Sequence, residues 1–492
     1  MSDILFTHSY FYRFDPKQWR AKQPYPPYGT LYAAALLRNC GLSVTLFDTN
    51  LKHAAAEILP VLQAEKPRYL VIYDDGFNYL TKMCLTRMRE AAFELAKYGK
   101  AQGCTVLVNS SDSSDHWEQY LSEGADVVVL GEGEMTLREL ILTLESGQND
   151  LSGIPGIAYR APKNAGAPST EPVLNAKRPV LHDLDSLPDP AWDLVDMDAY
   201  RQLWAKHHGY FSLNLATTRG CPYKCNWCAK PIYGNRYHAR SPERVVAEIA
   251  QLMERYGVRH FWFADDIFGL KPGWVQRFRD LVLERGLQFQ YKIQSRVDLL
   301  LQADTIDALV ASGLKQVWVG AESGSQKVLD AMDKGTTVAE IQKSTRLLQQ
   351  KGVEVCFFLQ FGYLGETKAD IEATVEMVET LLPHDIGISV SYPLPGTKFY
   401  DKVQNLLGAK QNWTDSDDLA MLYPGTFSQA YYRRLHRWVH KRFRLRQGLA
   451  QWRRLWQTGK TDWRSALLVL YYAPGAWVDG RRLGRLEGEV KI

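Results

Sequence analysis

The sequence predicts an α/β protein with two successive parallel-sheet domains and a helical C-terminal region. Apolar strand patterns alternate with helical segments twice, once before about residue 185 and again over about residues 200–400. The basic and aromatic segment after residue 400 has helical spacing instead. Strands that alternate with helices of about 10–15 residues are typical of parallel sheets. We therefore place domains at 1–185, 200–400 and 401–492.

The composition is that of a folded protein with reduced thiols. Hydrophobic residues make up 46% and charged residues 23% of the 492 positions, and the formal net charge is +4. That charge is too small to indicate a nucleic-acid partner by itself. The seven cysteines are an odd number with three in one cluster, which fits a reducing cytosol better than a disulfide framework. No signal peptide and no apolar run of about 18 residues is evident, so we expect a cytoplasmic protein.

The first domain has the pattern of a doubly wound, Rossmann-like sheet. Five apolar runs, ILFTHS, SVTLFDT, YLVIYDD, TVLVNSS and DVVVLGEGE, are each followed by a helical segment. GEGE is not a dinucleotide fingerprint, because that motif follows the first strand and GEGE follows the fifth. Ligands of such sheets bind at the carboxyl ends of the strands. The strand tips expected to face a ligand are residues 8–10, 74–78, 109–112 and 131–134.

The second domain has six β/α units in series, which predicts a partial (β/α)6 TIM-type barrel. Its strands are LNLATT, HFWFADD, QYKIQSR, QVWVGAE, VCFFLQFG and ISVSYPL. Polar residues follow consecutive apolar runs, so we expect their side chains to point into the barrel mouth, where the sites of such barrels lie. They are Asp265, Asp266, Gln294, Ser295, Arg296, Glu322, Ser323 and Gln360.

A loop after the first strand of this domain holds Cys221, Cys225 and Cys228, in the sequence CPYKCNWC. A closed zinc site usually takes four protein ligands, so His238 would have to be the fourth. Iron–sulfur clusters are held by cysteine thiolates, and three cysteines on a [4Fe–4S] cluster leave one iron open. Isolated cysteines are commonly buried. We therefore expect the other four in the core, namely Cys40, Cys84, Cys104 and Cys356.

These motifs together resemble the radical S-adenosylmethionine (SAM) superfamily. Cys-x3-Cys-x-aromatic-Cys is its hallmark, here with Trp227 as the aromatic residue. ADDIFG, GAESGS, GYLGET and PLPGT follow at suitable intervals, although Leu364 stands where proline is commoner. The resemblance covers about residues 205–400. It implies a [4Fe–4S] cluster on the three clustered cysteines, SAM on the open iron, and reductive cleavage of SAM to a 5′-deoxyadenosyl radical.

The same resemblance implies a SAM site at the strand ends. Glu322 would contact the ribose hydroxyls, and residues 294–296 the methionine part or the ribose. The complete implied set of SAM-binding residues is Trp227, Asp265, Gln294, Ser295, Arg296, Glu322, Ser323 and Gln360.

The domain order resembles the cobalamin-binding class of this superfamily, which includes the anaerobic magnesium-protoporphyrin IX monomethyl ester cyclase and class B methyltransferases. QPYPPYGTLYAAALL and VVVLGEGE resemble segments around the cobalamin, and WTDSDDLAMLYPGTF resembles a segment of cyclase relatives. The signature Asp-x-His-x-x-Gly is absent, as in members that bind cobalamin without a lower-face histidine. The implied cobalamin-binding residues are His8, Tyr10, Tyr25, Asp74, Phe77, Asn78, Asn109, Ser110, Ser111, Gly131, Glu132 and Gly133.

The favoured function is methyl transfer to an unactivated carbon, and the second hypothesis is radical cyclisation or rearrangement. We expect a small-molecule substrate and an external reductant such as flavodoxin or ferredoxin. A methylthiotransferase is an alternative, but the N-terminal cysteines do not match its motifs. A zinc-stabilised module that binds nucleic acid or membrane is an alternative from another class. The sequence identifies no general acid or base.

The C-terminal region is predicted to be a helical cap. Tyr432, Leu435, Val439 and Phe443 recur at helical spacing, and arginines fill the opposite face. The apolar run SALLVLYYAPGAWV is interrupted by Pro474 and Gly475, and we expect it to form a packed helix. Peripheral membrane contact through these basic and aromatic helices is the alternative to a solvated cap. Nucleic acid is a less favoured partner.

Overall fold

The computed structural model describes residues 2–83, 85–160, 171–228, 230, 232–458 and 463–487, so the prediction for Cys84 lies outside the described residues. The chain divides into two compact units. The first comprises Met1–Pro222, Lys230–Tyr291 and Asn412–Asp418. The second comprises Tyr223–Ala229, Lys292–Gln411 and Leu419–Ile492. Each unit is therefore built from three separated stretches of the chain.

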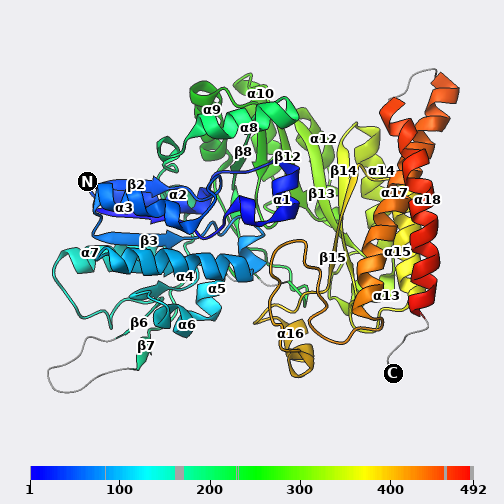
Figure 1. Ribbon diagram of the computed structural model, residues 1–492. Helices are drawn as coiled ribbons and strands as arrows, with labels where there is room; N and C mark the ends of the chain where they lie inside the picture. Colours follow the sequence, from blue (N-terminus) through cyan, green and yellow to red (C-terminus); the bar gives the residue numbers. More distant parts are fainter. Residues whose placement is uncertain are drawn as a thin grey trace. The chain divides into compact units, whose positions relative to one another are not determined.

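The N-terminal sheet lies in the first unit and has seven strands in the order β2-β1-β3-β4-β5-β6-β7 (Figure 1). The first five strands are parallel, and β6 and β7 add an antiparallel edge that the sequence patterns did not predict. The strands are β1 Ile4–Thr7, β2 Val44–Phe47, β3 Tyr69–Tyr73, β4 Thr105–Asn109, β5 Val127–Val129, β6 Ile157–Arg160 and β7 Pro172–Leu174.

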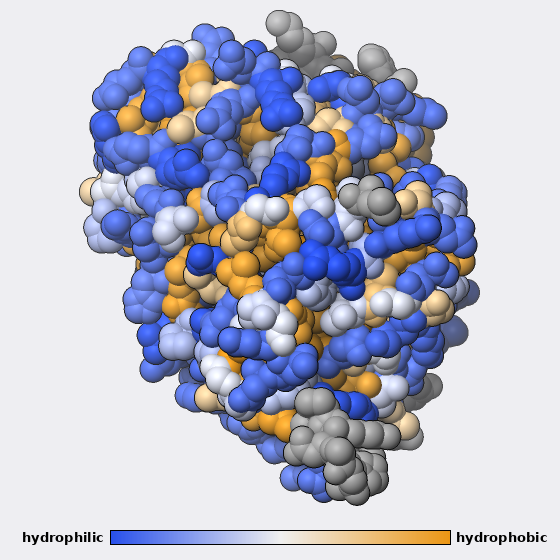
Figure 2. Space-filling view, turned by 90° about the vertical axis from the view of Figure 1, so that its left-hand side faces the viewer, coloured by the Kyte–Doolittle hydropathy of each residue, from blue (hydrophilic) through white to orange (hydrophobic). Residues whose placement is uncertain are grey.

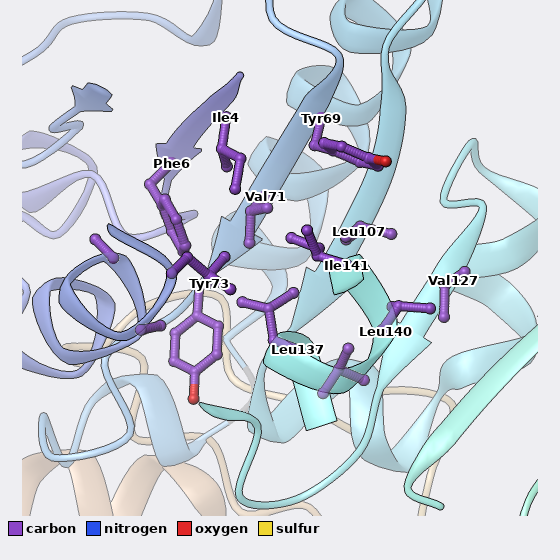
Figure 3. Packing of buried hydrophobic residues seen from close by; sticks show 14 of the residues in the cluster. Ile4, Phe6, Tyr69, Val71, Tyr73, Leu107, Val127, Leu137, Leu140 and Ile141 are labelled. Atoms are coloured by element: carbon purple, nitrogen blue, oxygen red, sulfur yellow. The ribbon is translucent and has the colours of Figure 1, made fainter. Parts of the chain in front are cut away.

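Helices pack on both faces of this sheet because successive strand residues point to opposite sides. Helices α2 (Tyr28–Arg38) and α7 (Glu134–Glu145) bury one face, as Figure 3 shows for Leu137 and Ile141 beside the strands. Helix α4 (Thr86–Ala101) packs on the other face with α3 and α6. The sheet is thus doubly wound. Its remaining helices are α1 Pro16–Ala21, α3 Leu59–Glu65, α5 Ser111–Asp115 and α6 Trp117–Ser122.

The strand order has one functional consequence. The chain leaves β1 toward β2 on one side and returns to β3 on the other, so the order reverses between β1 and β3. In doubly wound sheets, ligands bind outside the carboxyl ends of the strands at this reversal. The segments that follow β1 and β3 are 8–10 and 74–78, two of the four predicted ligand-facing tips.

A second sheet has six strands in the order β15-β14-β13-β12-β11-β8, which follows the order of the chain. The recorded pairs β8–β11, β13–β14 and β14–β15 are parallel, and helices separate the strands. This agrees with the predicted six β/α units. The strands are β8 Ser212–Leu215, β11 His260–Phe263, β12 Gln290–Ser295, β13 Leu314–Glu322, β14 Glu354–Phe361 and β15 Asp385–Val390. The helices are α9 Pro242–Tyr256, α10 Trp274–Glu284, α11 Val297–Leu300, α12 Thr305–Ala311, α13 Gln326–Ala331, α14 Val338–Gln350, α15 Lys368–Leu381 and α16 Lys398–Val403.

The C-terminal part of the second unit is a pair of long helices, α17 (Gln429–Thr458) and α18 (Trp463–Leu486), which lie side by side (Figure 1). The predicted apolar face of α17 is buried, with Leu435 and Phe443 fully inaccessible. Helix α18 continues through Pro474, in agreement with the predicted helix. Among the described residues, no helix is long and apolar enough to cross a membrane.

One face of the molecule is seen in Figure 2, where hydrophobic residues lie in interrupted patches among hydrophilic ones. Scattered apolar residues are normal on folded domains and indicate no partner by themselves.

Candidate active site

The first unit holds the residues that lead into the cysteine loop. Asp265 follows β11 and is buried; its Oδ1 accepts hydrogen bonds from the backbone of Thr217 (2.7 Å) and Thr218 (2.8 Å). Its Oδ2 accepts from Thr217 Oγ1 (2.5 Å). Burial raises the pKa of Asp265 to about 6. Asp265 was predicted to bind SAM. In the structure its carboxylate instead stabilises the segment before Cys221 through these hydrogen bonds.

Gly220 is required by the backbone at the start of the loop. Its φ is +78°, and a Cβ there would clash with the carbonyl oxygen of Arg236 and lie 3.1 Å from that of Gly234. Strand β9 (Thr218–Arg219) pairs with β10 (His238–Ala239) across the same turn. The path of the chain into Cys221 is thus fixed by backbone contacts.

Arg219 joins this segment to the loop after β5. Its guanidinium pairs with Glu132 and with Glu134 (2.8 Å), and all three side chains are buried. Tyr233 and Phe77 lie over the guanidinium, with ring centroids 5.2 and 5.5 Å from Cζ. Arg219 could not be recognised in the sequence, because its partners lie more than 80 residues earlier. Glu132 was predicted to bind cobalamin, but its carboxylate forms an ion pair with Arg219.

The tips of β1 and β3 are linked to each other. Ser9 donates its backbone N–H (2.7 Å) and hydroxyl (2.8 Å) to Asp74. His8 is buried and contacts Asp48 (2.9 Å) and Thr49, so both ring nitrogens are engaged. Tyr10 is buried, and in the described chain its hydroxyl has no hydrogen-bond partner. Of the predicted cobalamin-binding residues at these two tips, Tyr10 therefore has a hydroxyl group that is available to a ligand.

The loops after β4 and β5 use their predicted residues mainly in local structure. Asn109 donates to the carbonyls of Val129 (2.9 Å) and Gly131 (3.1 Å). Ser110 caps α5, whose first residue, Ser111, is buried. A Cβ on Gly133 would clash with Asn109 and Tyr73, so this loop packs directly against the carboxyl ends of β3 and β4.

The remaining predicted cobalamin residues differ in their surroundings. Phe77 is buried between Tyr28 and Tyr233. Asn78 accepts from Leu80 N–H within the turn after β3. The ring of Tyr25 lies against Trp204 and Trp262, so it packs beside β11, while its carbonyl accepts a hydrogen bond from Asn50. Eleven of the twelve residues therefore lie on the tips of the first sheet, and Tyr25 does not.

Two cavities flank these tips in the first unit. One, with a cavity volume of about 10 Å³, is lined by Ser9, Tyr10 and Asp15 among others. The other, also of about 10 Å³, is lined by Phe77, Arg219 and Arg240 among others. Each has room for about one water molecule, far less than an ordinary ligand pocket offers. The reversal of strand order and the buried hydroxyl of Tyr10 fit a cofactor at the carboxyl ends of β1 and β3. A corrin ring would have to displace side chains that fill this region in the structure.

In the second unit, Asn226 fixes the cysteine loop from within. Its side chain donates to the carbonyl of Ala331 (2.7 Å) and accepts from Tyr363 Oη (2.7 Å). Its backbone bonds to Met332 and Phe399. Asn226 is buried, so it holds the loop to α13, to the turn after β14 and to α16. Asn226 was not among the predicted site residues, although its place between two cysteines was a usable signal.

Arg296 lies next to the same loop. It donates to the carbonyls of Lys334 (2.8 Å) and Gly335 (3.3 Å), and its Nη1 is 3.9 Å from Cys225 Sγ. Its guanidinium stacks 3.7 Å from the ring centre of Tyr223. Most of its hydrogen-bonding capacity is therefore used by the protein, and its positive charge lies beside a predicted cluster ligand.

Glu322 and Lys334 form a buried ion pair at 2.8 Å at the end of β13. Burial lowers the pKa of Lys334, but Glu322 and Cys225 raise it more, so Lys334 stays charged. Glu322 has a left-handed φ of +56°. Such strain in a non-glycine residue clusters at functional sites. Lys334 was missed in the sequence because it comes after the strand-end motif.

The other predicted SAM residues of the second unit are placed by neighbouring strands and helices. Ser323 shares a hydrogen bond with Thr374 of α15 (3.0 Å), and Gln360 donates to Ser391 after β15 (2.9 Å). Gln294 and Ser295 end β12, half-buried and buried respectively. The indole of Trp227 packs among Val328, Phe399 and neighbours, and its Nε1 has no partner among the described residues.

The three loop cysteines are half-buried thiols and not disulfide-bonded in the described chain. Their donor chemistry suits an iron–sulfur cluster. No three His, Cys, Asp or Glu side chains of the described residues are arranged to hold a metal ion. His238, the zinc alternative, stacks on His182 at 4.6 Å. Of the outlying cysteines, Cys104 and Cys356 are buried as expected, while Cys40 is only half-buried.

A sequence model of the radical SAM superfamily matches residues 215–378, which contain the cysteine loop, Arg296, Glu322 and Lys334. These residues of the chain are thus similar to the radical SAM superfamily. A radical SAM domain implies a [4Fe–4S] cluster and SAM. The match supports the prediction of a radical SAM enzyme.

Relatives extend the similarity beyond the radical SAM domain. An uncharacterized methyltransferase of Pyrococcus horikoshii is 30% identical over 290 residues, which cover 58% of this chain and 60% of that protein. The anaerobic magnesium-protoporphyrin IX monomethyl ester cyclase of Cereibacter sphaeroides is 28% identical over 290 residues, covering 57% and 45%. The matched segments thus span less than two thirds of either relative.

Two solved structures share the fold. The cobalamin-dependent SAM radical enzyme OxsB with aqua-cobalamin bound has a TM-score of 0.72 and 17% identity, covering 98% of this chain and 72% of that one. The radical SAM methyltransferase TsrM of Kitasatospora setae, with cobalamin and a [4Fe–4S] cluster bound, has a TM-score of 0.65 and 19% identity, covering 82% and 75%. The predicted fold class is confirmed.

Proposed function

We propose that this chain is a cobalamin-dependent radical SAM methyltransferase that acts on an unactivated carbon of a small molecule. The observation that carries the proposal is the three-cysteine loop of the radical SAM domain, preceded by a doubly wound sheet with its order reversal between β1 and β3. The names of the relatives and the cofactors of OxsB and TsrM support it. The domain limits 1–185, 200–400 and 401–492 belong to the same proposal.

The chain's own residues would do the following. Cys221, Cys225 and Cys228 would hold the cluster. Glu322 offers a carboxylate that could accept hydrogen bonds from the hydroxyl groups of SAM. Lys334 offers a buried ammonium that could pair with an anionic group of SAM. A bound cluster, SAM and cobalamin would together supply a 5′-deoxyadenosyl radical and a transferable methyl group. Trp227, Gln294, Ser295, Arg296, Ser323 and Gln360 remain proposed SAM contacts, with Asp265 acting through the strand before the loop.

Cobalamin would bind at the carboxyl ends of β1 and β3 in the first sheet. Tyr10 is the residue whose buried hydroxyl is available for hydrogen bonding there, among the described residues. His8 is engaged by Asp48 and Thr49, which supports binding without a lower-face histidine. Tyr25 lies in the segment before α2, and its ring packs against Trp262 of β11, so its side chain is engaged by the second sheet.

Cyclisation or rearrangement is the second candidate, favoured by the similarity to the anaerobic cyclase. Flavodoxin or ferredoxin as electron donor, a cytoplasmic location and peripheral membrane contact through the C-terminal helices belong to the proposal as well.

Cluster content tests the proposal first. After anaerobic reconstitution we expect about four irons and four sulfides per chain and reductive cleavage of SAM. Cys225→Ala should abolish both, whereas Cys40→Ala, which changes a half-buried cysteine outside the loop, should change neither. One zinc per chain without iron would overturn the assignment in favour of a zinc module.

The reaction is tested with SAM labelled in its methyl group, added to an extract with the reconstituted enzyme. Label in a product supports methyl transfer. Deoxyadenosine formation without label transfer supports cyclisation or rearrangement. Corrinoid binding is measured separately, and an intact cluster without corrinoid binding would refute only the cobalamin assignment.

A further inference from the structure

The exposed apolar side chains of the described residues gather on the two C-terminal helices. Fifteen large hydrophobic residues are exposed, and eight of them lie on α17 or α18. The most exposed are Trp456 (84%), Tyr471 (76%) and Leu470 (69%). Contiguous apolar surface of this kind indicates a partner, unlike scattered single residues.

These residues form stripes along the helices. On α18 they are Leu467, Leu470, Tyr471, Trp477 and Val478, which recur after three or four residues and again about two turns later, so they share one face of the helix. Ala476, Asp479 and Leu483, on the opposite side of α18, are buried. The exposed stripe is therefore the face that α18 turns away from its packing partner.

Ion pairs explain which face is inward. Asp479 pairs with Arg434 (2.6 Å) and Lys441 (2.7 Å) of α17, so α18 is held to α17 through that side. On α17, Leu449, Trp452 and Trp456 continue the exposed apolar surface toward the end where α18 begins. The inward faces of α17 and α18 therefore hold the two helices together, and their outward faces carry the exposed apolar residues.

The charge of these helices identifies the kind of partner. They carry thirteen arginine and lysine residues and one aspartate, while the whole chain has a net charge of only +4. The rest of the chain is therefore net negative. Arg481 stacks on Trp477 at 3.8 Å, and Arg453 and Arg482 are exposed beside the stripes. Tryptophan, tyrosine and arginine beside leucine are the composition of helices that lie in a membrane interface.

We infer that the exposed face of α17 and α18, defined by Leu467, Leu470, Tyr471, Trp477 and Trp456 with the adjacent arginines, docks on an anionic lipid bilayer. This deepens the peripheral membrane contact proposed above and does not depend on the reaction. A second copy of the chain would bring the same positive charge, which disfavours self-association through this face. An anionic bilayer takes the apolar side chains and the arginines together, and its surface charge repels the negative remainder of the chain.

Vesicle co-sedimentation of the full chain tests the inference. Phosphatidylcholine vesicles are compared with vesicles that contain about one third phosphatidylglycerol, and we expect at least about tenfold stronger binding to the second, lost at high salt. Leu467→Ser with Leu470→Ser should weaken binding about tenfold or more. The matched control is Leu283→Ser on α10, because Leu283 and Leu467 are both 57% exposed.

The charge is tested with Arg481→Gln and Arg482→Gln together, which should reduce binding to anionic vesicles about tenfold or more. Arg285→Gln, which removes an exposed arginine after α10, should leave binding unchanged. Absence of binding to anionic vesicles would overturn the inference. So would equal losses in the Leu283 and Leu467 variants, or a dimer in light scattering that Leu467→Ser dissociates. SAM cleavage measured on the same samples separates failure of docking from failure of the proposed enzyme.

Discussion

Glu366 is a fully buried carboxyl group in the turn between β14 and α15. Its Oε2 accepts the N–H of Gly362 at 2.6 Å, and its Oε1 has no partner among the described residues. Burial raises the pKa of Glu366 from 4.5 to about 8. A carboxyl group in such a place is protonated in the folded protein over a range in which the unfolded chain has already ionised.

Protein stability should therefore fall as pH rises from about 4.5 to about 8, because the folded state holds a proton that the unfolded state has lost. Glu366→Gln should remove about 3–5 kcal/mol of this pH dependence. Denaturant unfolding at pH 5 and pH 8 measures it. The control is Glu376→Gln on the exposed side of α15, and a variant of Glu366 with an unchanged pH profile would contradict the assignment.

Gly220 allows a second residue-level test. Gly220→Ala should lower the free energy of unfolding by about 1–3 kcal/mol and reduce cluster loading, because the new Cβ clashes with a backbone carbonyl. Gly209 has nearly the same φ, +77°, with nothing within 4 Å of its Cβ position. Gly209→Ala thus carries the backbone strain without the clash. Equal effects on cluster loading would show that the contact with Arg236 does not matter.

The site residues that the sequence revealed are those with local signals. The cysteines have a diagnostic spacing, and Glu322 and Arg296 come directly after apolar strands. Lys334 and Arg219 have no such signal, because each acquires its role from a carboxylate brought close by folding. The contacts proposed for SAM and cobalamin remain predictions.

At the scale of elements, Arg219 ties β9 to the loop after β5 through two buried carboxylates. Removing one partner of a buried ion pair leaves an uncompensated charge and costs about 3–5 kcal/mol. Arg219→Met should destabilise the first unit by about that amount in denaturant unfolding.

Two further variants make the Arg219 test specific. Arg38→Met breaks the exposed pair with Asp193 and should cost at most about 1 kcal/mol. Adding Glu132→Gln and Glu134→Gln to Arg219→Met should recover part of the stability, since the buried charges are then gone. No recovery would mean that packing around Tyr233 and Phe77 dominates.

Most elements followed from periodicity. The five parallel strands of the first sheet lie within the predicted apolar runs, and all six strands of the second sheet overlap theirs, although four of them begin one to three residues earlier. Strands β6 and β7 did not follow from periodicity, because they are short and pair antiparallel at a sheet edge. Pro474 interrupts the apolar run of α18 but not the helix itself, which continues through it while Asp479 pairs with α17.

At the scale of the whole molecule, the cysteines fall into two classes of accessibility. Cys104 and Cys356 are buried, and burial raises the pKa of both thiols. In the cluster-free native protein, an alkylating reagent should label Cys40, Cys221, Cys225 and Cys228, and reach Cys104 and Cys356 only on unfolding.

Peptide mass spectrometry reads out this labelling. Loading the cluster should protect Cys221, Cys225 and Cys228 and leave Cys40 reactive. Labelling of Cys356 in the native protein would contradict the buried position of β14.

The fold class could be predicted because alternation of strands and helices is local information. The division into two units could not, because it depends on which distant segments meet. Asn412–Asp418 shows this: it belongs to the first unit, where Trp413 and Ser416 bond to Thr86 and Asp15.

That seven-residue segment also sets an order of events during synthesis. The first unit lacks its last piece until the ribosome has added roughly 200 residues beyond Pro222, which takes about 10–40 s at ordinary rates of translation. During this interval Asp15 and the start of α4 lack the segment to which they bond in the complete unit. The nascent first unit would therefore remain incomplete until late in synthesis, and a chaperone would be expected to act on it in this interval.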